Sequence, residues 1–161
     1  MFSKYHIKGR WPTSERFVFA SCDNTYFDQF AERFQKSFKQ HFDLPVHLHL
    51  INPQTEQMML CSKWGVTYTY NHIDSGLYQE RVDAVKKSKT DISDEVANRE
   101  VYWGFCQAIR FWMLGQYQTE KQNIVVADID CVAVQKPTNL QWQDLFAKTQ
   151  FSKHYDRVMA T

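Results

Sequence analysis

The sequence predicts an α/β protein in which helices cover both faces of an open, mainly parallel sheet, a three-layer α/β/α arrangement. Short apolar runs alternate with segments of helical periodicity along the chain, and this alternation is typical of parallel sheets with crossover helices. The continuous apolar run 124–127 indicates a central strand that is buried on both faces. In such sheets ligands bind at the carboxyl ends of the strands, so residues that follow strands are the first candidates for a site.

The composition predicts a single cytoplasmic domain spanning residues 1–161. Hydrophobic residues make up 43% of the 161 positions, which is enough for a sizeable core. The formal net charge of +1 lacks the basic surplus that nucleic-acid partners require. We expect no transmembrane segment, because no apolar run approaches about 18 residues, and no signal peptide, because residues 1–16 are polar and mixed. The four cysteines are isolated from one another, which indicates reduced thiols rather than a metal site or a disulfide framework.

The first strand and the first helix are predicted at the start of the domain. Residues 17–22 form a short apolar run that is typical of a strand, and a helix is expected from Tyr26 onward. Asn24 or Thr25 is the expected cap of this helix. Its apolar residues recur at helical spacing: Phe27, Phe30, Ala31, Phe34 and Phe38.

Two further strands and a short helix are predicted in the middle of the chain. Alternating apolar residues over 46–50 predict the second strand. A short helix is expected over 54–64, ended by Gly65, and a third strand over 66–70. The polar, lysine-rich segment 71–91 is expected to be a mobile surface loop.

A long helix and the most hydrophobic strand complete the prediction. The helix is expected over residues 93–117, and the strand 124–127 follows it. We assign Trp103 and Trp112 to the core. The apolar positions of the helix are Val96, Tyr102, Trp103, Cys106, Ile109 and Met113.

The most specific chemical feature is a pair of acids, Asp128 and Asp130, directly after the apolar strand. In extended backbone, carboxylates two residues apart point the same way, and their oxygens suit a hard cation such as Mn²⁺ or Mg²⁺. A buried strand that ends in two acids also needs a cation or hydrogen-bond donors to offset desolvation. The alternative is a surface turn in which both acids are solvated.

A second candidate segment begins at Ser21 and follows the first predicted strand. Asp23 and Asn24 offer groups that hydrogen-bond a base or a ribose, and Tyr26 offers a ring on which a base can stack. The alternative is an ordinary turn that caps the following helix.

Arg110 and two histidines are the remaining polar candidates. Arg110 lies on the long helix, where its guanidinium could meet a diphosphate near the two acids. The alternative is an arginine that pairs with Glu100 or Glu120. His47 and His49 alternate with aliphatic residues, and we expect them to be solvent-facing or hydrogen-bonded rather than metal ligands, since no third ligand lies nearby in the sequence.

These features occur in an order that resembles the family 8 glycosyltransferases, which have the Rossmann-like A-type nucleotide-diphospho-sugar transferase fold. The resemblance covers residues 17–142, the expected core of the domain. It implies a metal-dependent transfer of a hexosyl group from a nucleotide sugar, expected to be a UDP sugar, to an unknown saccharide, lipid or protein acceptor. The segments that carry it are 17–26, 108–111, 125–130 and 131–140.

The resemblance also implies roles for individual residues. Asp128 and Asp130 would bind Mn²⁺ or Mg²⁺ against the diphosphate. The residues at nucleotide-sugar positions would be Ser21, Asp23, Asn24, Tyr26, Arg110 and Asp128. The catalytic residue is left unassigned.

The sequence departs from the family pattern in its C-terminal part, and two alternative functions remain open. The family completes its acceptor pocket far beyond the paired acids, whereas 31 residues follow Asp130 here and His154 comes too early to be the later metal ligand. We therefore expect a truncated domain that lacks the C-terminal acceptor half. The first alternative is a phosphatase of the haloacid dehalogenase type, in which Asp128 attacks the phosphate and Asp130 is the general acid. The second is a non-catalytic nucleotide-binding half-domain or fragment.

Overall fold

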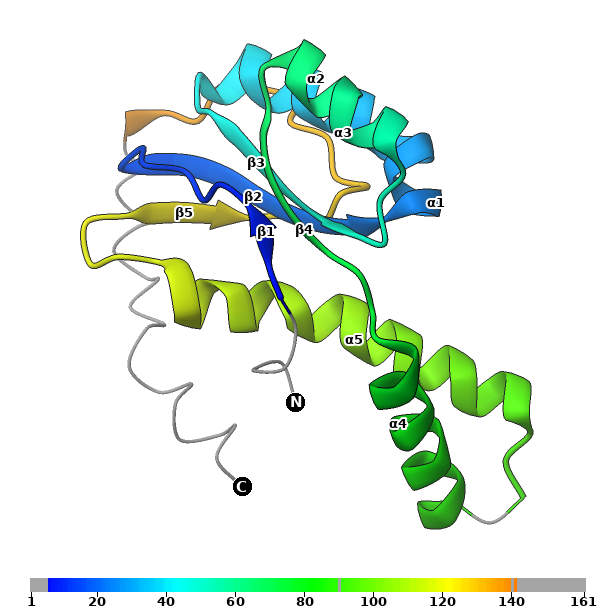
Figure 1. Cartoon of the computed structure of the whole chain (residues 1–161). Coiled ribbons are helices and arrows are strands. Elements are labelled where there is room, and N and C mark those ends of the chain that lie inside the picture. Colours follow the sequence, from blue (N-terminus) through cyan, green and yellow to red (C-terminus); the bar gives the residue numbers. More distant parts are fainter. Residues whose placement is uncertain (1–5, 90, 140, 142–161) are drawn as a thin grey trace.

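Five strands form one mixed sheet in the part of the chain that the computed structural model describes, which is residues 6–89, 91–139 and 141 (Figure 1). The strands are β1 Lys8–Gly9, β2 Arg16–Asp23, β3 Val46–Ile51, β4 Thr67–Asn71 and β5 Asn123–Val126. Their order in the sheet is β1-β4-β3-β2-β5, in which β2 to β5 run parallel and β1 is antiparallel to β4. The predicted α/β class with a mainly parallel sheet is confirmed.

Helical segments connect the strands largely as the periodicity predicts. They are α1 Asn24–Tyr26, the π-helical turn η2 Phe27–Ala31, α2 Glu32–Phe42, α3 Thr55–Trp64, α4 Ser75–Ser88 and α5 Asp94–Tyr117. The first helical segment is capped by Asp23 and not by Asn24 or Thr25, because the Asp23 carboxylate accepts a hydrogen bond from the backbone N–H of Tyr26 at 2.9 Å. The predicted cap was therefore wrong by one residue.

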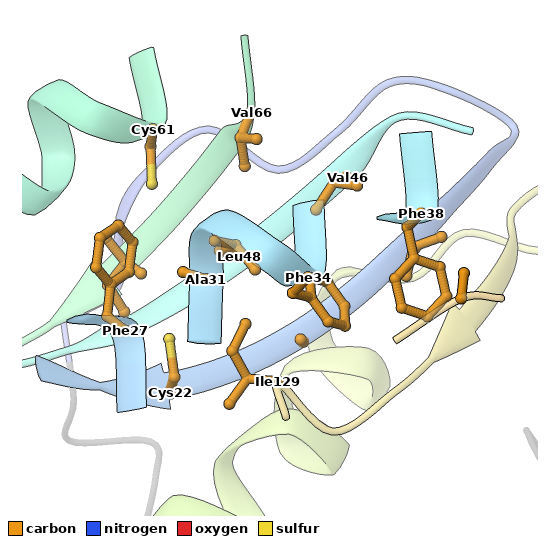
Figure 2. Packing of buried hydrophobic residues seen from close by; sticks show 14 residues of the cluster. Cys22, Phe27, Ala31, Phe34, Phe38, Val46, Leu48, Cys61, Val66 and Ile129 are labelled. Carbon is orange, nitrogen blue, oxygen red and sulfur yellow. The ribbon is translucent and has the colours of Figure 1, made fainter. Parts of the chain in front are cut away.

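The two faces of the sheet carry separate hydrophobic clusters, because side chains alternate along β2. Val18 and its even-numbered neighbours pack toward α2 and α3, whereas Phe17 and Phe19 pack toward α5. Figure 1 shows α2 and α3 over one face of the sheet and α5 along the other. Residues from α2, β3 and the turn after β5 meet in the first cluster, as Phe34, Leu48 and Ile129 do in Figure 2.

Helix α4 lies in the segment 71–91, for which a surface loop was predicted, so that prediction was wrong. The Asp74 side chain caps α4 by accepting from the N–H of Leu77 at 2.9 Å. Tyr78 donates its hydroxyl proton to the carbonyl of Asn98 at 2.8 Å, which ties α4 to α5. Val82 is the only buried residue of α4, so the segment lacks the apolar stripe by which helices are recognised in a sequence.

Strand β5 lies at the edge of the sheet formed by the described residues, whereas the sequence predicted a central strand. It pairs with β2, and Ile124 and Val125 are only partly buried. Val126 is 38% exposed. A short apolar run fits any strand with one covered face, so the run alone could not fix its position in the sheet.

Strand β3 is buried along its whole length, and it carries two histidines within a hydrogen-bonded ladder. The His47 ring nitrogens lie 3.0 Å from the Thr67 hydroxyl and 3.1 Å from the Thr69 hydroxyl. The His49 ring nitrogens lie 3.0 Å from the Thr69 hydroxyl and 2.9 Å from the Asn71 amide oxygen. Both imidazoles are fully buried, so of the alternatives left open for them the hydrogen-bonded one is correct and the solvent-facing one is wrong.

Some predictions lie outside the described residues. The end of the expected core at Trp142, the position Leu140 and the histidine His154 are among them. Within the described part of the chain, no helix is long and apolar enough to cross a membrane.

Candidate functional site

A pocket of about 280 Å³ lies where the carboxyl ends of β2 and β5 meet α5. The chain places β3 and β4 on one side of β2 and then returns to place β5 on the other side. Ligand sites of open α/β sheets form at such reversals of strand order, because the connections diverge there and leave a crevice. The pocket is lined by Ser21, Cys22, Asp23, Tyr26, Tyr102, Trp103, Cys106, Gln107, Arg110, Asp128, Ile129 and Asp130.

The structure brings most of the sequence-predicted site residues into this pocket. The ones that line it are Ser21, Asp23, Tyr26, Arg110, Asp128 and Asp130. Asn24 does not line it, although its buried side-chain oxygen has no hydrogen-bond partner among the described residues. The two strand ends that the sequence singled out therefore form one site, with one predicted residue left outside.

Asp23 joins the two walls of the pocket. One carboxylate oxygen accepts from the Tyr26 N–H, and the other accepts from the Tyr102 hydroxyl at 3.0 Å. The turn after β2 is thereby tied to α5. Ser21 lies 3.5 Å from the Cys106 carbonyl across the same junction. An ionised carboxylate oxygen has two lone pairs, so Asp23 can still accept from a ligand N–H or O–H.

Asp128 and Asp130 lie in a tight turn, whereas extended backbone was expected. The N–H of Cys131 donates to the carbonyl of Asp128 at 3.0 Å, which closes the turn. Ile129 between the two acids is 4% exposed and packs in the core cluster of Figure 2, while both acids are exposed. The buried isoleucine anchors the turn, so that both carboxylates are held at the pocket rather than on a free loop.

Arg110 forms an ion pair with Asp128 and not with either glutamate that was considered for it. Glu100 pairs with Lys89 at 2.6 Å instead. The Arg110 side chain is 17% exposed, and its Nε–H is buried without a hydrogen-bond acceptor among the described residues. A buried donor without an acceptor is costly, so an anion that reached this guanidinium would be bound favourably.

The charged lining of the pocket is acidic. Three carboxylates, those of Asp23, Asp128 and Asp130, stand against the one guanidinium of Arg110, which leaves a formal charge of −2. Such a pocket repels an anion unless a divalent cation enters with it. The described residues contain no group of three metal-ligating side chains, so the protein would supply two carboxylates. That number fits Mg²⁺ or Mn²⁺ sites in which substrate phosphates complete the ligand set.

Apart from Arg110, the residues that α5 contributes to the pocket were missed in the sequence. Trp103 was assigned to the core but is 59% exposed, so that assignment was wrong. Tyr102 and Cys106 were treated only as apolar positions, and Gln107 was not considered. Their spacing relative to Arg110 could have indicated that they line the same pocket, since residues three, four, seven and eight apart share one side of a helix. Burial and the nearby Asp23 carboxylate together raise the pKa of the Cys106 thiol to about 12, which keeps Cys106 protonated and a poor nucleophile.

Comparison of the chain with protein-family models, curated proteins and solved structures finds no match. The pocket itself is therefore the basis for assigning a function. Its lining combines the guanidinium of Arg110 and the carboxylates of Asp128 and Asp130 with aromatic rings and the hydrogen-bond acceptor Asp23.

Proposed function

We propose that the chain is the donor-binding domain of a metal-dependent hexosyltransferase that uses a nucleotide sugar, with UDP as the expected nucleotide. In this proposal the domain has the three-layer A-type arrangement, and the acceptor is a saccharide, a lipid or a protein. The observation that carries the proposal is the pocket at the strand-order reversal. It gathers Asp23, Arg110 and Asp128 from distant parts of the chain.

The charges of the pocket suggest how the leaving group would be stabilised. Asp128 and Asp130 would hold Mn²⁺ or Mg²⁺, which supplies Lewis-acid stabilisation of the charge that develops on the diphosphate. Arg110 would add a second positive charge on the same side. Because Arg110 is paired with Asp128 in the free protein, diphosphate binding would redirect its guanidinium and release Asp128 toward the cation.

The other end of the pocket would hold the nucleoside. Asp23 is an acceptor that can meet an N–H of a base such as uracil, and Tyr26 presents a 44% exposed ring. The hydroxyl of Ser21 lies at the same strand end and can contact a ribose. The pairing of Asp23 with Tyr102 keeps its carboxylate oriented before the ligand arrives.

The phosphatase alternative is supported less well. That chemistry uses a lysine beside the nucleophilic aspartate, and none of the described pocket residues is a lysine. Asp128 is also engaged by Arg110, which reduces its nucleophilicity. The non-catalytic alternative shares the donor pocket and differs only in turnover, so an activity assay separates it from the transferase.

The test is hydrolysis of a panel of UDP-hexoses in the presence of Mn²⁺, in which water takes the hexosyl group and the released UDP and hexose are measured by chromatography. The parent chain should release UDP, and Asp130→Asn should abolish the release because it removes a carboxylate ligand without changing side-chain size. Asp91→Asn is the matched control, since Asp91 is exposed, lies outside the pocket and has a positive φ of 72° that asparagine tolerates. Equal release by the parent and Asp130→Asn would refute the metal role. Phosphate release from a generic phosphomonoester would favour the phosphatase.

A further inference from the structure

Helix α5 presents a stripe of three pocket residues that differ in chemistry along its length. Trp103, Gln107 and Arg110 are spaced four and three residues apart, so they lie on one side of the helix, and all three line the pocket. Seven residues of α-helix rise by about 10 Å, which separates the indole from the guanidinium along the axis. The stripe therefore has an aromatic end and a cationic end.

The pocket that receives the aromatic end of this stripe has a second exposed ring in its lining. Trp103 is 59% exposed and Tyr26 is 44% exposed, and both line the pocket. The two segments that carry these rings are joined, because Asp23 accepts from the N–H of Tyr26 and from the hydroxyl of Tyr102, the residue that precedes Trp103. Single exposed aromatic residues are common on protein surfaces, but two at one concave site beside a hydrogen-bond acceptor are typical of ligand recognition.

We propose that Trp103 is the principal stacking surface for the flat ring of a nucleoside diphosphate, with the diphosphate lying farther along α5 at Arg110 and Asp128. The inference rests on the proposed function and adds to it the residue that holds the ring end of the ligand. An exposed indole offers the largest π-face among the side chains, and its stacking tolerates any base. Choice among bases would then come from the acceptor Asp23 and not from the ring.

Two independent features fix the direction in which the ligand lies. Among the described lining residues only Arg110 carries a positive charge, and the two acids proposed to hold the cation lie in the same pocket, so the anionic group would lie at the Arg110 end. The exposed aromatic rings among the described lining residues are those of Trp103 and Tyr26, and Trp103 lies at the other end of the stripe. Gln107 lies between the two ends, where its amide can both donate to and accept from the hydroxyl groups of the ribose.

The experiment compares UDP with inorganic pyrophosphate as ligands, both with Mn²⁺, by isothermal titration calorimetry. Trp103→Ala should weaken UDP binding about tenfold, because loss of one base–aromatic stack has an effect of this size, and should leave pyrophosphate binding unchanged. Trp103→Phe should restore most of the UDP affinity. Met59→Ala is the matched control, since Met59 is 65% exposed but lies on α3 outside the pocket.

A second readout is tryptophan fluorescence. UDP should change the emission of the parent chain, and this change should be lost in Trp103→Phe although the nucleotide still binds. If the parent binds UDP and Trp103→Ala binds it equally well, the stacking role is overturned while the proposed donor site stands. An equal loss of UDP and pyrophosphate in Trp103→Ala would make Trp103 a structural residue. A folded parent that binds neither ligand would overturn the proposed function and this inference together.

Discussion

Acidification should destabilise the protein through the two imidazoles buried in β3. His47 and His49 are 0% exposed, and their ring nitrogens face hydroxyl and amide groups rather than a carboxylate. Burial, with a smaller contribution from the neighbouring His49, lowers the pKa of His47 to about 3. Burial lowers the pKa of His49 to about 4. The folded state therefore holds both rings neutral at pH values at which the unfolded chain protonates them.

The sign and size of the effect follow from proton linkage. A histidine whose folded pKa lies below the unfolded value of 6.5 contributes its full stability above that value and loses it as the pH falls. When the pH falls from about 7.5 to about 5, the contribution of each ring to the free energy of unfolding decreases by about 2 kcal/mol. At pH 5 the solution is about 1.5 pH units below the unfolded pKa, and each unit changes the free energy by about 1.4 kcal/mol. Both rings together reduce the free energy of unfolding by about 4 kcal/mol, a large fraction of the stability of an ordinary domain.

The assay is urea denaturation followed by circular dichroism at the two pH values. His49→Gln should reduce the pH-dependent difference by about half, because one titrating ring is removed from the buried ladder. His72→Gln is the control for loss of an exposed imidazole outside that ladder. If the parent has the same free energy of unfolding at both pH values, or if His49→Gln keeps the full difference, the assignment of two buried neutral imidazoles is refuted.

Three further substitutions test the core, the pocket and the junction between its walls. Phe34→Ala should lower the free energy of unfolding by about 3–5 kcal/mol, because Phe34 is fully buried among α2, β2 and the turn after β5. Denaturant midpoints measure this change, and a loss of less than about 1 kcal/mol would contradict the packing. Arg110→Ala should lower the affinity for UDP at least tenfold in calorimetry but leave the affinity for uridine nearly unchanged, since the proposed contact of Arg110 is with the diphosphate. Equal losses of affinity for the two ligands would show that Arg110 supports the fold and not the diphosphate. Tyr102→Phe should weaken UDP binding by a few-fold without a change in far-ultraviolet circular dichroism, because it removes the hydrogen bond that orients the Asp23 carboxylate. Parent-like affinity would show that Asp23 needs no support from α5.

The periodicity of the sequence predicted most elements, because burial on one face leaves a regular pattern. The aromatic residues of α2 at helical spacing and the alternation in β3 are such patterns, and both elements are present. The same reasoning failed for α4, which buries only Val82 and is stabilised by its cap and its contact with α5. It also failed for β5, since hydrophobicity shows that a face is covered but not how many neighbours a strand has.

The candidate site was predictable to the extent that it depends on strand ends. The carboxyl ends of parallel strands lie at one edge of a sheet, which is why Asp23 and Asp128 come to line the same pocket. The contribution of α5 was not predictable in the same way. Tryptophan is a large aromatic residue of the kind usually assigned to a core. The exposure of Trp103 follows from the orientation of α5 about its axis, which is set by the packing of Phe105, Ile109 and Met113 against the sheet.

The most direct test of the account is calorimetric titration of the chain with UDP, with and without Mn²⁺. The acidic lining of the pocket predicts that UDP binds when Mn²⁺ is present and binds at least tenfold more weakly without it, because two uncompensated carboxylates face the diphosphate. Equal affinity with and without the cation would contradict the role of Asp128 and Asp130. No binding under either condition, from a sample whose circular dichroism shows a folded α/β protein, would contradict the donor site itself.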